Sequence, residues 1–191
     1  YAACAVTGTT NVGGLVGVNG GTITGCYVTS LISGDSYVGG LVGKNSYGII
    51  NDCYATSSVS GGSSAGGLVG NISYGTITGC YVTSSVNGNG YVGGLVGYCF
   101  QSTITACYAT GSVNGSGTIG GLVGSNNYGS QVTACFAASV VSGTNDACGL
   151  VGTNSDSSII SCFWDMQKSG QAGSSGGKGL TTEQMKTMSI Y

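Results

Sequence analysis

Short runs of alternating apolar and polar residues recur along the chain about every 27 residues. In one copy Cys80, Val82 and Val86 share one parity, whereas Tyr81 and Thr83 share the other. Successive side chains of a β-strand point to opposite faces, so the Cys and Val stripe is predicted to face a core and the Tyr and Thr stripe the solvent. The residues upstream of each Cys are out of phase with this stripe, so we expect a corner just before it.

Each copy also carries the block Gly-Gly-Leu-Val-Gly, which predicts a second wall of the same core. Its leucine is expected to be buried, and its glycines allow bends and close backbone approach. With the polar turns between the apolar runs, three strands and three turns fit one repeat. The block begins at Gly13, Gly39, Gly66, Gly93 and Gly120, Cys148 replaces its first glycine in the sixth copy, and its leucines are Leu15, Leu41, Leu68, Leu95, Leu122 and Leu150.

One such repeat cannot bury its own apolar face, so the copies are expected to stack. Strands spaced by about 4.8 Å give a rod roughly 30 Å long, and parallel crossovers are expected to wind right-handed. The predicted fold is all-β, a right-handed parallel β-solenoid (β-helix) of coils of about 27 residues. Residues 1–161 are predicted to form six repeat coils, the first shortened, and residues 162–191 a divergent closing segment and cap.

The closing segment predicts a cover for the last coil. A Gly- and Ser-rich stretch precedes residues 181–188, which are predicted as a short helix. Thr181 and Gln184 fit a capping box, and Met185 and Met188 share one helix face. A short helical or loop cap protects an otherwise open sheet edge, and the alternative is a flexible tail.

Several motifs recur in register: Gly-Gly-Leu-Val-Gly-x-Asn, Gly-Thr-Ile-Thr and Cys-Tyr-Ala-Thr. Together they resemble the GLUG repeat of bacterial surface proteins, and Phe163-Trp164-Asp165 looks like the start of the segment that often closes such arrays. The resemblance implies a large secreted or cell-wall-attached bacterial protein, such as an adhesin or certain immunoglobulin A peptidases whose repeats lie outside the catalytic domain. The chain has no His, so it lacks the His-Glu-x-x-His of those enzymes, and the resemblance brings no catalytic residues.

Charge is scarce: 5% of the residues are charged and the net charge is −2. This balance offers no basic surface for nucleic acid, and no apolar run approaches the ~20 residues that insert into a membrane. Low charge with abundant Ser, Thr and Asn fits an extracellular or cell-surface location. The chain begins at Tyr1 rather than Met, which predicts a processed product or a piece of a larger protein.

The ionisable residues occupy different repeat positions, so stacking does not gather the acids into a cluster. Acid–base catalysis needs paired or base-assisted groups. Although polysaccharide lyases also use β-helices, no enzyme activity and no catalytic residue is predicted. The calcium-binding Gly-Gly-x-Gly-x-Asp pattern is absent, and no cofactor or metal is expected. The acids are Asp35, Asp52, Asp146, Asp156, Asp165 and Glu183, and the bases are Lys44, Lys168, Lys178 and Lys186.

Seven cysteines recur at nearly the repeat interval and form a predicted structural ladder, from which Cys99 and Cys148 stand apart. Cα atoms one coil apart lie within the disulfide range of about 4.4–6.8 Å, whereas free Cys also packs as a small hydrophobe. Three states stay open: a mainly reduced ladder, some disulfides between coils, and a metal site, against which the absence of Cys-x-x-Cys counts. The ladder is Cys4, Cys26, Cys53, Cys80, Cys107, Cys135 and Cys162.

The outward Tyr and Thr columns are the candidate interaction face. Stacking and Thr pairs between coils, worth about 0.2–1 kcal/mol each, give it a purely structural interpretation. The functional alternative is a surface for a glycan, a protein or a second copy. Threonine arrays also suggest ice binding, but Thr-x-Thr is broken at residues 49–51, 131–133 and 158–160. The face comprises Tyr27, Thr29, Tyr54, Thr56, Tyr81, Thr83, Tyr108, Thr110 and Phe136.

These observations favour an extracellular structural module of a bacterial surface protein or a self-assembling fibre, which associates end to end or side by side through open edges. The alternative is an adhesin-type module that binds a glycan or host surface protein through the Tyr and Thr ladders. Ice binding is a minor alternative.

Overall fold

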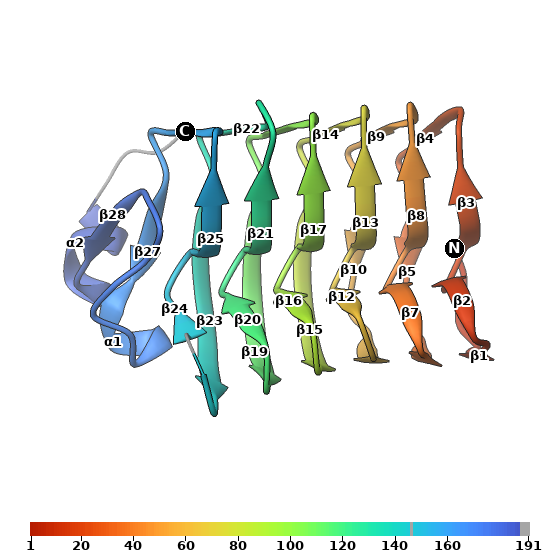
Figure 1. Ribbon diagram of the computed structural model, residues 1–191, viewed down its shortest axis with the longest axis horizontal. Coiled ribbons are helices and arrows are strands. Elements are labelled where there is room, and N and C mark those ends of the chain that lie inside the picture. The colour runs from red at the N-terminus through yellow and green to blue at the C-terminus, as the bar shows by residue number, and fades with distance from the viewer. Residues whose placement is uncertain (146, 188–191) are drawn as a thin grey trace.

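Parallel coils stack along one axis, as the repeat predicts. The computed structural model describes residues 1–145 and 147–187. In Figure 1 the near strands run upward and the far strands downward while the chain advances from right to left, which is a right-handed winding. Neighbouring coils pair in parallel register along every side of the rod. The predicted right-handed parallel β-solenoid is confirmed.

Each coil contributes to four sheets, named A to D. Sheet A has ten strands, β1 (Ala5–Thr7), β5 (Tyr27–Val28), β6 (Leu31–Gly34), β10 (Tyr54–Ala55), β11 (Ser58–Gly61), β15 (Tyr81–Gly88), β19 (Tyr108–Gly115), β23 (Phe136–Gly143), β27 (Phe163–Asp165) and β28 (Lys178–Leu180). Sheet B has six strands, β2 (Thr10–Gly13), β7 (Ser36–Gly39), β12 (Ser64–Gly66), β16 (Tyr91–Gly93), β20 (Thr118–Gly120) and β24 (Ala147–Cys148). Sheet C has six, β3 (Val16–Asn19), β8 (Val42–Ser46), β13 (Val69–Ser73), β17 (Val96–Phe100), β21 (Val123–Asn127) and β25 (Val151–Ser155). Sheet D has six, β4 (Thr22–Thr24), β9 (Ile49–Asn51), β14 (Thr76–Thr78), β18 (Thr103–Thr105), β22 (Gln131–Thr133) and β26 (Ser158–Ile160).

The coil therefore has four sides rather than the three strands predicted. The Gly-Gly-Leu-Val-Gly block is not one wall, because sheet B ends at its first glycine, Gly93 in β16, and sheet C begins at its valine, Val96 in β17. The chain bends between them. A Cβ atom at Gly94 would lie 2.1 Å from the carbonyl oxygen of Gly121, so only glycine fits this bend.

The corner predicted before each inward cysteine, between sheets D and A, is confirmed. The residue before that cysteine has a left-handed backbone, with φ of 51–63°. This turn reverses the phase, so that Ile77 before it and Cys80 after it are both fully buried. The corner residues are Gly25, Asp52, Gly79, Ala106, Ala134 and Ser161.

The inward columns form two apolar cores. The larger contains the leucine of the repeated block, fully buried in five coils, together with the inward cysteines. A smaller core of aliphatic columns, with Val86 of sheet A and Val92 of sheet B, lies between those two sheets. The prediction of a buried leucine is wrong at Leu15, which is 37% exposed because it lies in the first coil, where no coil covers its outer side.

The predicted cap is confirmed and covers the last coil, at the left of Figure 1. Trp164 closes the larger core and donates from Nε1 to the carbonyl oxygen of Gln171 at 3.1 Å. Two short helices follow, α1 (Met166–Ser169) and α2 (Thr182–Thr187). Neither helix of the described segments has the length and apolar character needed to cross a membrane. Met188, half of the predicted Met pair, lies outside the described residues.

Hydrogen bonds fasten this cap. The buried carboxylate of Asp165 accepts from the backbone N–H of Lys168 at 2.9 Å and from the hydroxyl of Thr182 at 2.8 and 2.9 Å. Thr181 and Gln184 exchange two bonds of 2.9 and 3.2 Å, so the predicted capping box is confirmed.

The Gly- and Ser-rich stretch pairs with the edge of the last coil. The N–H of Gly149 donates to the carbonyl oxygen of Gly173 at 2.9 Å. Val151 donates to Oγ of Ser174 at 2.9 Å and accepts from the N–H of Ser175 at 3.0 Å. These bonds occupy edge groups that would otherwise be free to pair with another strand.

Candidate functional site

Six cysteines form one column at the corner between sheets D and A. In the first four pairs, the backbone N–H of each Cys donates to Sγ of the Cys in the next coil, with N···S distances of 3.3–3.4 Å. Each thiol faces the carbonyl oxygen two residues earlier, at 3.0–3.5 Å. The column consists of Cys26, Cys53, Cys80, Cys107, Cys135 and Cys162.

Cys4 does not belong to this column, which corrects the predicted ladder. Its N–H donates to Oγ of Ser30, 26 residues further on, at 3.3 Å, so Cys4 occupies a serine position of the coil. The aromatic column instead begins at Tyr1, whose ring centroid lies 5.2 Å from that of Tyr27. The 22-residue interval from Cys4 to Cys26 reflects this difference in position.

Hydrogen bonding explains why cysteine fits the column. The N–H at this corner points to the next coil and needs a side-chain acceptor there. Serine does the same before sheet D, where Gly75 donates to Ser102 Oγ at 3.1 Å and Ser102 donates to Ser130 Oγ at 3.2 Å. Sulfur is a weaker acceptor, but its apolar surface suits the larger core. These contacts favour a structural role for the thiols.

Replacing Cys107 with alanine is expected to lower the free energy of unfolding by about 1–3 kcal/mol, because the N–H of Cys80 loses its acceptor. Cys107→Ser keeps an acceptor and is expected to lose less. Urea denaturation of both variants measures the difference. If the alanine and serine variants lose the same free energy of unfolding, the hydrogen bond that the sulfur accepts does not contribute to stability.

Thiol titration separates the reduced ladder from one with disulfides. All nine cysteines are free in the structure; six are buried and Cys4 is exposed. Reactivity requires access, so we expect one fast-reacting thiol in the native protein, absent in Cys4→Ser, with the half-buried Cys26 and Cys148 reacting more slowly. Nine thiols should titrate after denaturation without reductant, and a smaller number would demonstrate disulfides between coils.

Cys99 lies apart from the column, fully buried in sheet C, and burial raises the pKa of its thiol from 9.0 to about 12. A raised folded-state pKa gives stability that is complete below pH 9 and lost as the pH rises toward 12. This group is therefore expected to reduce the free energy of unfolding by about 1.4 kcal/mol per pH unit in that window. Urea unfolding across the window should give a shallower decline in Cys99→Val than in the parent, and identical declines would contradict the assignment.

The predicted interaction face forms an aromatic stack on the outside of sheet A. Its rings lie 4.2–5.1 Å apart between centroids with interplanar angles of 4–24°. Thr83 and Thr110 beside the stack share a hydrogen bond of 3.0 Å. Each ring face lies against the next ring, so the stack presents mainly ring edges to solvent. The stack consists of Tyr27, Tyr54, Tyr81, Tyr108 and Phe136, with Thr29, Thr56, Thr83 and Thr110 two residues after its tyrosines. Its use as a binding face stays a prediction.

Sheet D carries the Thr-x-Thr positions in two aligned columns. Ile49, Gln131 and Ser158 interrupt one column, and Asn51 and Ile160 interrupt the other. The threonine array is therefore irregular in space as well as in sequence, which gives ice binding no further support.

The charged residues that the structure describes do not assemble into a reactive cluster. The carboxylate of Asp165 is engaged within the cap, and Glu183 pairs with Lys186 at 2.9 Å on an exposed helix. Asp146 lies outside the described residues. Across residues 1–145 and 147–187, no group of three or more His, Cys, Asp or Glu side chains is placed to hold a metal ion.

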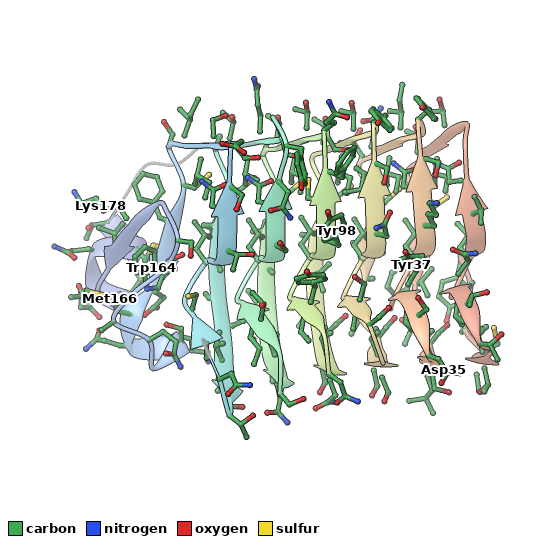
Figure 2. All side chains as sticks on the ribbon, in the orientation of Figure 1. Asp35, Tyr37, Tyr98, Trp164, Met166 and Lys178 are labelled. Atoms are coloured by element: carbon green, nitrogen blue, oxygen red, sulfur yellow. The ribbon has the colours of Figure 1, made fainter. Side chains whose placement is uncertain are left out.

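A groove that the sequence analysis missed runs where the outer faces of sheets B and C meet. At its floor a Cβ atom on Gly97 would lie 2.8 Å from the backbone of sheet B, so the two sheets approach closely. Above the floor, the rings of Tyr91 from β16 and Tyr98 from β17 are 5.2 Å apart between centroids and inclined at 43°. Figure 2 shows Tyr37 and Tyr98 on this same face, and Nζ of Lys44 lies 5.9 Å from the Tyr37 ring centroid.

Two hollows flank the Tyr91 and Tyr98 pair, with volumes of about 340 and 330 Å³. Burial raises the pKa of the Tyr98 hydroxyl. The signal in the sequence was the run of residues 91–98, the one copy in which tyrosines flank the glycine block on both sides. The hollows are lined by Tyr37, Ser63, Ser64 and Asn71 on one side of the pair and by Thr118, Ser125, Asn127, Tyr128, Thr153 and Ser155 on the other.

Comparison with known proteins relates the repeat to a described motif. A family model of the GLUG motif matches residues 4–32, 34–60 and 88–114. No curated protein matches the chain. The fold is similar to the crystal structure of a protein from Bacteroides ovatus described as a candidate immunoglobulin A1 protease, with a TM-score of 0.74 and 19% identity. That match covers 95% of this chain and 66% of the other, less than two thirds, and at this identity it shows the fold alone.

Proposed function

We propose that this chain, which carries GLUG repeats on a β-solenoid, is a non-catalytic structural module of a secreted or surface-attached bacterial protein. One observation carries the proposal: an apolar core runs through the stacked coils, with Leu41, Leu95 and Leu150 all fully buried. Such a core makes a stiff rod, because each coil is bonded to both neighbours. The bacterial surface location is supported by the GLUG motif and by the fold of the B. ovatus protein.

The cap favours a discrete rod over a fibre that grows end to end. Head-to-tail growth needs a free edge at both ends of the solenoid. Here Trp164 closes the core of the last coil, and residues 173–175 occupy its edge hydrogen-bonding groups. A self-assembling fibre would require this cap to be displaced.

Electron microscopy of the purified protein tests this proposal. We expect isolated rods of one length at every protein concentration, with a radius of gyration in X-ray scattering that does not change with dilution. Regular polymers would overturn the discrete rod and favour the fibre.

An adhesin role through the Tyr and Thr ladders has less support. Binding a sugar or an apolar side chain on an aromatic platform needs a free ring face. In the stack from Tyr27 to Phe136 those faces lie against each other.

A further inference from the structure

The groove between sheets B and C differs from the ladders in the way its rings are presented. Tyr91 is 40% exposed. It meets Tyr98 at 43°, whereas Tyr81 and Tyr108 stack at 7°. An inclined, exposed ring leaves a face on which an apolar ring surface can pack.

The lower walls of the groove are polar, although they are removed from bulk water. Ser64 and Ser125 are each 2% exposed and Asn71 is 6% exposed. The Oδ1 atom of Asn71 accepts from Oγ of Ser73 at 3.1 Å, and Nδ2 of Asn71 is not among the buried polar atoms of the described residues that lack a partner. Polar groups that line an open hollow can exchange their bonds to water for bonds to a ligand, so these walls suit a ligand that carries hydroxyl groups.

Charge narrows the choice of ligand. The residues that line the two hollows are Tyr, Ser, Thr and Asn, none of them charged at neutral pH. Lys44 lies beside the groove, with its ammonium group directed to the Tyr37 ring. An anionic ligand would therefore find little compensation for the water it loses.

We propose that this groove binds an uncharged glycan chain, with a sugar ring packed on Tyr91 and hydroxyl groups bonded to the polar walls on either side. Tyr91 and Tyr98 line both hollows, which lie on either side of this pair along the solenoid axis. A chain of several sugars that runs along the axis therefore fits better than a single sugar. This binding goes beyond the structural role proposed above, and its failure would leave the rod intact.

Affinity electrophoresis of the full chain tests the proposal in gels that contain galactomannan, yeast mannan or hydroxyethylcellulose, with polygalacturonate as the anionic comparison. We expect at least one neutral polymer to retard the protein. Tyr91→Ala and Tyr98→Ala should each weaken that binding by on the order of tenfold, the loss of one aromatic contact. Tyr47→Ala is the matched control, because Tyr47 is 72% exposed and does not line the hollows.

Circular dichroism melts establish that each variant folds. Should Tyr98→Ala fail to fold, Tyr91→Phe is compared with Tyr91→Ala. The aromatic ring is kept in the first variant and lost in the second, so only the first should still bind the polymer. The proposal is overturned if none of the neutral polymers retards the protein, if only polygalacturonate does, or if Tyr47→Ala weakens binding as much as the groove variants.

Discussion

Replacing Leu95 with alanine is expected to lower the free energy of unfolding by about 2–5 kcal/mol, the range for truncating a buried leucine. Leu95 is fully buried in a central coil, and its backbone is bonded to those of Leu68 and Leu122 in the coils on either side. The cavity cannot collapse easily, because parallel strands on all sides hold the coil at a fixed spacing. Equilibrium unfolding in urea, followed by circular dichroism, gives the loss.

The chain provides a matched control in the first coil. Leu15 occupies the same position of the repeated block but is 37% exposed. Leu15→Ala is therefore expected to cost less than about 1 kcal/mol. If both substitutions cost the same, burial in the stacked core would not be what the leucine column contributes.

Trp164→Ala is expected to leave the core of the last coil uncovered at its C-terminal end. Truncating a buried tryptophan costs about 3–5 kcal/mol, and here it also uncovers the end of the larger core beneath the cap. The exposed edge should then pair with other molecules. We expect a lower melting temperature together with concentration-dependent association in size-exclusion chromatography with light scattering.

Trp164→Phe separates the two effects. It keeps an aromatic plug but removes the Nε1 donor to Gln171, so we expect a loss of about 1 kcal/mol and a protein that stays monomeric. If Trp164→Ala also stays monomeric at high concentration, the cap does not protect the edge of the last coil from pairing with other molecules.

The inward face of each strand was predictable from the sequence, because apolar and polar residues alternate with a period of two. The alternation through Cys80, Val82 and Val86 gave the correct inward face, because each position is constrained by packing in every coil. The number of sides was not predictable by the same means. Glycine fits a strand and a bend equally well, so the bend at Gly94 left no distinct mark in the pattern.

The position of Cys4 shows a different limit. Residue identity suggested that it begins the cysteine column, whereas backbone pairing sets it beside Ser30. Serine accepts a bond from a backbone N–H at the position of Cys4, as cysteine does in the cysteine column, so residue type alone does not tell the two positions apart. The missing aromatic after Cys4 was the residue-level sign of the different position.

The groove escaped prediction because its side chains vary from coil to coil. The position of Tyr91 is occupied by Ser64 in the coil before and by Thr118 in the coil after. Repeat analysis gives weight to what recurs, and these positions do not recur. Only the close approach of sheets B and C in space shows that they belong together.

The left-handed corners have a consequence for how such proteins change length over evolution. Neighbouring coils are offset by 27 residues between β14 and β18 but by 28 between β18 and β22, with the extra residue taken up in the corner before sheet D, at Tyr128 and Gly129. Insertions of one residue are thus absorbed outside the sheets, and every inward column keeps its alignment. Duplication or loss of a whole coil poses no new packing problem, because each coil meets only its two neighbours. Genetic recombination between repeats can therefore lengthen or shorten the rod in steps of about 4.8 Å while preserving its core.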